Sequence, residues 1–185
     1  MNTRHLVASL LCAIGLQACG GDANAPTSPT APATAPFRLT STAAVDGGPL
    51  PADYTCDGVG ATLPLAWANP PAGTREYALL MSTLPGDGTT KWNWVMYAIP
   101  SSVTALARNA IGIGSLGVGS DGPQAAYQPP CSQGPGAKVY TFTVYALSAP
   151  PQLPAGRIDG GVLTAAVVPV ALGSASMSVT YARPR

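Results

Sequence analysis

The side chains of this sequence with the clearest capacity to bind a ligand lie between residues 127 and 147, YQPPCSQGPGAKVYTFTVYAL. Residues 138–147 alternate between two faces that are mostly apolar or β-branched, which predicts a central β-strand. Lys138 and Tyr140 project from the same face of that strand, beside a loop that its prolines and glycines make rigid and tight. An ammonium group in this place suits an anion, although a lysine at the start of a strand is equally often simply solvated.

The only histidine, His5, falls in the N-terminal leader, so the exported chain is predicted to contain none. Its absence there excludes Ser-His-Asp and Cys-His catalysis and histidine-bound zinc. Lys138 beside Tyr140 could act as a base, but no nucleophile accompanies them at a fitting spacing. Residues 112–117 match GxGxxG, yet they lack the strand before and the helix after that a dinucleotide site needs. We therefore expect a protein without catalytic residues, metal or cofactor.

The N-terminal leader predicts the cellular localisation of the protein. Residues 1–18 contain Arg4 and an apolar run at 6–16, followed by Leu16-Gln17-Ala18-Cys19, which is typical of a secretion signal with a lipobox-like cleavage site. This pattern predicts an exported lipoprotein anchored through Cys19 and facing the periplasm or the cell exterior. The alternative is ordinary signal-peptide cleavage, which would leave a soluble periplasmic or secreted protein. After Cys19, residues up to 36 are mostly Ala, Pro, Thr, Ser and Gly and predict a disordered tether, so the domain spans 37–185.

Two of the four cysteines, Cys56 and Cys131, remain for the exported domain once Cys12 and Cys19 are assigned to the leader and the anchor. Two thiols in an exported domain are expected to form a disulfide. A reactive thiol pair is the less favoured alternative, since the sequence has no CxxC motif.

Composition limits both the fold and the partners. The 185 residues are 46% hydrophobic and only 9% charged, with 21 Gly and 20 Pro, which favours one domain of many short strands and turns. Without Arg4, eight basic residues face eight acidic ones, so the exported chain is neutral. No basic stripe is present, which argues against nucleic acid as a partner and leaves the lipid as the means of membrane attachment.

The remaining elements follow from alternation and turn residues. In the predicted strand 91–99, alternation places Trp92 and Trp94 on one face and Asn93 on the other. The Asn93 amide is predicted either to cap a neighbouring loop or, as the sharper alternative, to face a ligand cleft. A turn at 69–73 predicts that strands 63–67 and 75–82 pair. Further strands are expected at 37–42 and 174–182, a helical turn at 103–106, and a short helix at 159–168 capped by Asp159.

Taken in order, these segments resemble the phosphatidylethanolamine-binding protein family, and more closely its bacterial branch named after eukaryotic Raf kinase inhibitors. The resemblance covers nearly all of 37–183 and rests on FRLTS, DGGPLP, YTCDG, LPLAW, PPAGT, NWVMYAIP, YQPPC, YTFTVYALS and VTYARP. It implies a mainly β, antiparallel β-sandwich with short peripheral helices and a small anion-accepting pocket.

The resemblance also implies a set of pocket residues: Ser82, Asn93, Trp94, Tyr127, Pro130, Lys138 and Tyr140. Several depart from the family pattern, since Ser82-Thr83-Leu84-Pro85-Gly86 replaces an acidic loop and Asn93 and Lys138 stand where histidines are usual. The expected function is non-enzymatic binding of a small anionic or phospho-ester ligand, similar to a phospholipid headgroup. The alternative is a protein-interaction module that inhibits or regulates an exported enzyme, with a partner that the sequence does not identify.

Overall fold

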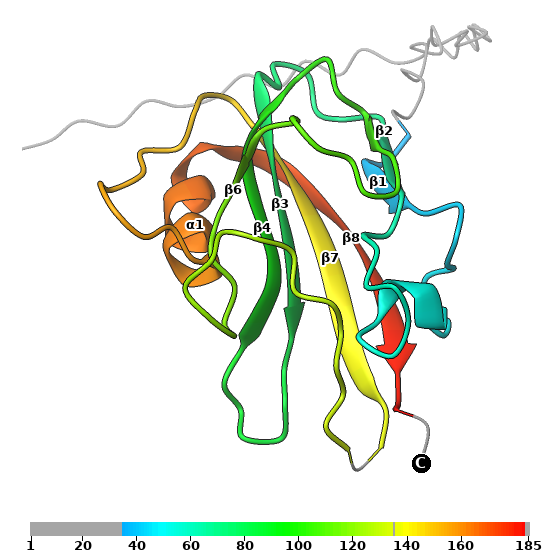
Figure 1. Ribbon diagram of the computed structural model, residues 1–185. Helices are drawn as coiled ribbons and strands as arrows, with labels where there is room; N and C mark the ends of the chain where they lie inside the picture. The colour runs from blue at the N-terminus through cyan, green and yellow to red at the C-terminus, as the bar shows by residue number, and fades with distance from the viewer. Residues whose placement is uncertain (1–34, 135, 184–185) are drawn as a thin grey trace, which may run out of the picture. The chain divides into compact units, whose positions relative to one another are not determined.

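Two antiparallel sheets form the domain, as seen in the computed structural model, which describes residues 35–134 and 136–183 (Figure 1). The larger sheet has the order β6 (Ser115–Leu116), β4 (Lys91–Pro100), β3 (Glu76–Thr83), β7 (Lys138–Leu147) and β8 (Ala171–Tyr181). The smaller sheet has the order β1 (Arg38–Thr40), β2 (Leu65–Ala68) and β5 (Ala105–Leu106). The predicted mainly β, two-sheet fold is therefore confirmed.

The larger sheet buries side chains on both of its faces. Between the sheets lies the main core, which includes Trp67, Tyr77, Trp94, Phe142 and Val179. Its other face packs Ala78, Leu80, Val95 and Leu147 against helix α1 (Gly160–Val167). Alternating residues of β3 therefore enter two different cores, because successive side chains of a strand point to opposite faces.

Several elements lie where the sequence predicts them. β7 spans Lys138–Leu147 and pairs with β3 on one side and β8 on the other, which makes it an interior strand. Helix α1 begins after Asp159, whose side chain accepts a hydrogen bond from the Val162 N–H at 3.0 Å. Two 3₁₀ turns complete the fold, η1 (Ala52–Tyr54) and η2 (Val168–Val170).

Three predictions about local structure are wrong. β2 and β3 do not pair, because β2 turns into the smaller sheet and bonds to β1 and β5. The expected helical turn at 103–106 does not form. Its last two residues are strand β5, which pairs with β2 in the smaller sheet. Trp92 does not share a face with Trp94, because a register shift between β3 and β4 places Trp92 against the helix-side core.

The predicted signal peptide, Cys19 and nearly all of the predicted tether lie outside the described residues. Within the described part of the chain, no helix is long and apolar enough to cross a membrane.

Candidate functional site

A β-bulge in β4 aims Asn93 at the inter-sheet side. Met81 of β3 pairs with Trp94, and the next residue, Ser82, pairs with Trp92, so Asn93 is the additional residue opposite this step. Such a bulge changes the alternation of side chains along one strand. Asn93 is 7% exposed and lies beside Tyr140 in the wall of one cavity.

Asn93 also fastens the segment that passes over the end of β4, residues 127–130, which we call the strap. The Asn93 carbonyl accepts a hydrogen bond from the Gln128 N–H at 2.7 Å, and its side-chain Nδ2 donates to the Gln128 carbonyl at 3.1 Å. Its Oδ1 is buried and has no partner among the described residues. The Asn93 amide therefore caps a loop, which is one of its two predicted roles, and Asn93 also lines a cavity. That this cavity binds a ligand stays a prediction.

This cavity, the polar cleft, has a volume of about 410 Å³. The ends of β3, β4 and β7 form its floor, and the strap and the β3–β4 turn contribute its walls. Four charged residues line it: Lys91, Lys138, Asp87 and Asp121. Neither lysine forms a salt bridge with any of the described residues, although both are only partly exposed. The cleft therefore offers two cations that can bind an anionic group.

Tyr140 adds an uncharged donor to the cleft. Its burial raises the pKa of the phenol, and the pKa is raised further by Tyr181 and Asp121, while the Cys131 backbone N–H acts in the opposite direction by hydrogen bonding to the phenol oxygen. The hydroxyl thus stays protonated at neutral pH. The protonated hydroxyl can donate its hydrogen to a ligand acceptor.

Asp121 is held at the cleft by the side-chain amide of Gln128, which hydrogen-bonds both backbone groups of Asp121. Gln128 Oε1 accepts from the Asp121 N–H at 3.0 Å, and Gln128 Nε2 donates to the Asp121 carbonyl at 2.9 Å. The strap is thereby joined to the glycine-rich loop before it, which brings Asp121 to the cleft.

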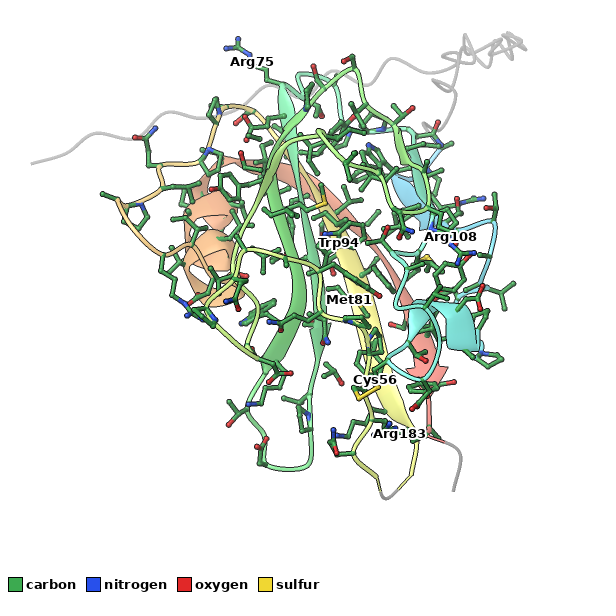
Figure 2. The ribbon with its side chains drawn as sticks, viewed as in Figure 1. Cys56, Arg75, Met81, Trp94, Arg108 and Arg183 are labelled. Carbon is green, nitrogen blue, oxygen red and sulfur yellow. A yellow bond between two sulfur atoms is a disulfide. The ribbon has the colours of Figure 1, made fainter. Side chains whose placement is uncertain are left out.

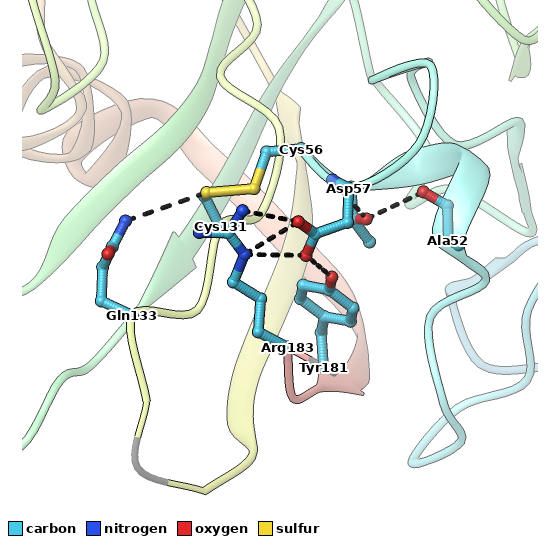
Figure 3. Close-up of polar contacts among 8 residues, drawn as sticks. Ala52, Cys56, Asp57, Cys131, Gln133, Tyr181 and Arg183 are labelled. Carbon is cyan, nitrogen blue, oxygen red and sulfur yellow. Dashed lines mark hydrogen bonds and ion pairs between the residues drawn. A yellow bond between two sulfur atoms is a disulfide. The ribbon is translucent and has the colours of Figure 1, made fainter. Parts of the chain in front are cut away.

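The far end of the strap is anchored by covalent and ionic contacts (Figure 3). Cys56 and Cys131 form a disulfide bond, with their Cα atoms 5.2 Å apart, and the Cys56 N–H donates to the Pro130 carbonyl at 3.0 Å. Asp57, the next residue, accepts hydrogen bonds from Arg183 at 2.8 and 3.0 Å and from the Tyr181 hydroxyl. The Arg183 hydrogen bond, followed by that of Tyr181, lowers the pKa of Asp57. These contacts hold Cys131 in the cleft wall.

Of the seven predicted pocket residues, the structure brings Asn93, Lys138 and Tyr140 together in the polar cleft. It does not bring the other four there. Ser82 pairs with Thr141 on the opposite sheet face, and the Pro130 carbonyl bonds Cys56 outside the cleft.

The two aromatic residues of that set lie in a packed layer behind the cleft. Tyr127 does not line the polar cleft, because its ring meets Trp94 edge to face at 5.3 Å and its hydroxyl donates to the Tyr54 carbonyl at 3.2 Å. Burial is the main cause that raises the pKa of Tyr127, and Tyr140 adds to it.

Sequence reasoning missed Lys91, Asp87 and Asp121. Lys91 and Asp87 could have been found from their position, since Lys91 is the first residue of β4 and Asp87 lies in the turn before it, at the same edge of the sheet as Lys138. Asp121 carried no such signal, because it is positioned by distant contacts: the hydrogen bonds of its backbone with the Gln128 side chain and those of the preceding Ser120 with Trp92.

A larger cavity of about 820 Å³, the apolar groove, lies on the other side of the strap. Trp94, Met96, Tyr97 and Tyr127 are among its lining residues, and no charged residue lines it. At its rim Ile111 is 91% exposed and Leu116 is 43% exposed. The strap therefore separates a charged cavity from an uncharged one.

A small two-sheet domain with a lysine-bearing cleft has the features of a small-ligand binding domain. Residues 40–182 match the family model described as phosphatidylethanolamine-binding protein. The chain belongs to the phosphatidylethanolamine-binding protein family, as its sequence motifs indicate.

Individual relatives agree with this assignment. The chain is 31% identical over 152 residues to the Mycobacterium tuberculosis protein named "Putative lipoprotein LppC", covering 82% of this chain and 75% of LppC. It is 32% identical over 143 residues to a UPF0098 protein of Methanothermobacter thermautotrophicus, covering 75% and 93% of the two chains.

Two crystal structures share the fold. That of CT736, a phosphatidylethanolamine-binding protein homologue from Chlamydia trachomatis, has a TM-score of 0.73 and 25% identity, with 80% of this chain and 98% of CT736 covered. That of Escherichia coli YbcL, a member of the mammalian family, also has a TM-score of 0.73, at 21% identity, with 81% and 100% covered.

Proposed function

We propose that this protein is a non-enzymatic binding domain that holds a small anionic or phospho-ester group in the polar cleft. The observation that supports this most directly is the convergence of Lys91, Lys138 and the Tyr140 hydroxyl on a cavity of about 410 Å³. Charge-assisted hydrogen bonds from lysine to phosphate oxygens are stronger than neutral ones, and the phenol proton adds a third donor. The size suits one small ligand rather than a polymer.

The two carboxylates that line the cleft restrict the class of ligand that it can bind. Asp87 and Asp121 balance the two lysines, so a doubly negative ligand would meet repulsion from their carboxylates. A phosphodiester carries a single negative charge, and a headgroup with an ammonium or hydroxyl group could donate to a carboxylate. A phospholipid-headgroup-like ligand is therefore preferred over a dianionic phosphate.

Titration of glycerophosphoethanolamine by calorimetry tests this function. Lys138→Gln should weaken binding about tenfold or more, since a hydrogen bond to a charged group contributes about 1.5–3 kcal/mol. Arg75→Gln removes one positive charge at the opposite end of the domain from Cys56 and Arg183 and serves as the matched control (Figure 2). Equal affinities for the two variants, or no binding by the unmodified protein, would refute the proposal.

The same titration has an expected pH profile. The exported chain is predicted to lack histidine, and the pKa of Tyr140 is raised away from neutrality. Binding of a phosphodiester should thus change little between about pH 5 and 8, the range in which a histidine would titrate. A tenfold change across this range would show that a group with a shifted pKa takes part.

We also propose export and lipid anchoring through Cys19, which the name of the relative LppC supports. Cys19→Ala should move the protein from the detergent phase to the aqueous phase on phase partitioning. Retention of that variant in the detergent phase would contradict the anchor.

A protein-interaction module is the second candidate function. It is favoured by the exposed side chains of Ile111 and Leu116 at the rim of the uncharged apolar groove. A photo-cross-linker at position 111, compared with one at the exposed Val45, would test it in the cell envelope. One defined adduct from position 111 alone would support this function, and identical products from both positions would oppose it.

A further inference from the structure

The end of the larger sheet that carries the polar cleft also carries exposed aliphatic side chains. Leu84 in the β3–β4 turn is 67% exposed and Val139 in β7 is 53% exposed. Both line one cavity of about 740 Å³ on the opposite sheet face from Tyr140, together with Pro85, Gly86 and Lys138. We call these residues the tip; Figure 1 shows the β3–β4 turn and the start of β7 projecting together at this end.

The tip and the polar cleft are neighbours across the sheet edge. Thr83, Pro85 and Lys138 line both cavities. Thr83 Oγ1 donates to the Val139 carbonyl at 2.7 Å, which joins the two strands between the apolar side chains and the cleft. A surface that touches Leu84 and Val139 would therefore lie directly at the mouth of the cleft.

From this arrangement we infer that the tip rests on a phospholipid bilayer and presents the polar cleft to the headgroups. Exposed aliphatic side chains gain free energy when they enter the boundary between headgroups and acyl chains, and lysine stems extend alongside while their ammonium groups stay in the polar layer. The proposal deepens the proposed function, on which it rests for the identity of the ligand. The lipid anchor would supply attachment, and the tip would set the orientation.

The charges around the tip indicate which bilayer it fits. Lys91 and Lys138 are balanced by Asp87 and Asp121, so the lining of the polar cleft carries no net charge. Such a lining matches zwitterionic headgroups, which also carry one charge of each sign, and gains little from an anionic surface. Contact with the bilayer should accordingly be insensitive to salt.

The other exposed aliphatic pair makes a matched alternative. Ile111 and Leu116 also share a cavity, but no charged residue lines it and it shares no lining residue with the polar cleft. If exposure alone selected the membrane-facing surface, Ile111 at 91% would be preferred over Leu84 at 67%.

The test places a tryptophan at each position, as Leu84→Trp and Ile111→Trp, in the processed protein isolated from the host envelope. Each variant is combined with phosphatidylcholine vesicles whose acyl chains are brominated near the headgroup, and quenching is compared with that of the unmodified protein, which supplies the background of Trp67, Trp92 and Trp94. We expect about twofold or greater quenching of the added fluorescence at position 84 and little at position 111, unchanged at high salt. Equal quenching at both positions, more at 111, or none at 84 would overturn the proposal.

Titration of the same proteins with glycerophosphoethanolamine separates this proposal from the proposed function. If Leu84→Trp binds like the unmodified protein but is not quenched, the bilayer orientation is wrong and the ligand site stands. If position 84 is quenched while the unmodified protein binds no glycerophosphoethanolamine, the orientation stands and the ligand site is wrong.

Discussion

Removal of the Cys56–Cys131 disulfide should destabilise the domain by several kcal/mol while leaving the polar cleft nearly intact. The bond joins residues separated by 75 positions in the chain. In the chain-entropy model, a closed loop of this length removes enough freedom from the unfolded chain to stabilise the folded state by about 4 kcal/mol. For a domain of this size, 1 kcal/mol corresponds to about 2–4 °C in the unfolding temperature, so we expect a loss of roughly 8–16 °C.

The folded structure holds the cleft wall without the covalent bond. The Pro130 carbonyl still accepts the Cys56 N–H at 3.0 Å, and Asn93 still binds both backbone groups of Gln128. The affinity for glycerophosphoethanolamine at room temperature should therefore fall less than about threefold, which is about 0.6 kcal/mol.

Thermal unfolding followed by circular dichroism measures the first effect, with Cys56→Ser/Cys131→Ser compared against the unmodified protein. Reductant should lower the unfolding temperature of the unmodified protein and leave that of the double variant unchanged. A decrease below about 3 °C would show that the bond contributes little to the free energy of unfolding. A tenfold loss of affinity would show instead that the disulfide shapes the native cleft.

Two further predictions concern the folded framework. Gly160→Ala should lower the free energy of unfolding by about 1–3 kcal/mol in urea titrations, because a Cβ there would overlap the Trp92 indole. The control, Gly161→Ala, should change it by less than about 1 kcal/mol, because its Cβ would meet only Asp159 Oδ1 at 3.4 Å. Equal losses would contradict the packing of Trp92 on α1. The pKa of Asp57 is lowered in the folded state, so its ionised carboxylate stabilises the fold above the unfolded pKa, and this stabilisation is lost as pH falls through the folded pKa. The unmodified protein should therefore lose more of its free energy of unfolding than Asp57→Asn between about pH 5 and 2. Parallel acid titrations of the two proteins would refute this assignment.

The parts of the fold that the sequence predicts well are those decided by local chemistry. β7 alternates over its whole length, and α1 begins at a capping carboxylate, so neither depends on distant residues for its existence. The disulfide follows from a count, since only Cys56 and Cys131 remain once Cys12 and Cys19 are assigned to the predicted leader and anchor. The pairing of β2 is different, because the turn at 69–73 reverses the chain but does not decide which sheet receives it; its partner Leu106 comes much later in the sequence.

The candidate site depends on Asn93, whose side chain strict alternation along β4 would have placed on the wrong face of the sheet. With strict alternation from Trp94, which lies in the inter-sheet core, Asn93 would face helix α1 and could not share a cavity with Tyr140. The resemblance to the family places Asn93 in the pocket and thereby conflicts with the alternation predicted for the same strand. The register shift between Met81 and Ser82 resolves this conflict, since it turns Trp92 to the helix side and leaves Asn93 on the side of Tyr140. Both backbone groups of Gln128 are then bound by Asn93, so the bulge that opens the cleft also fixes the strap beside it.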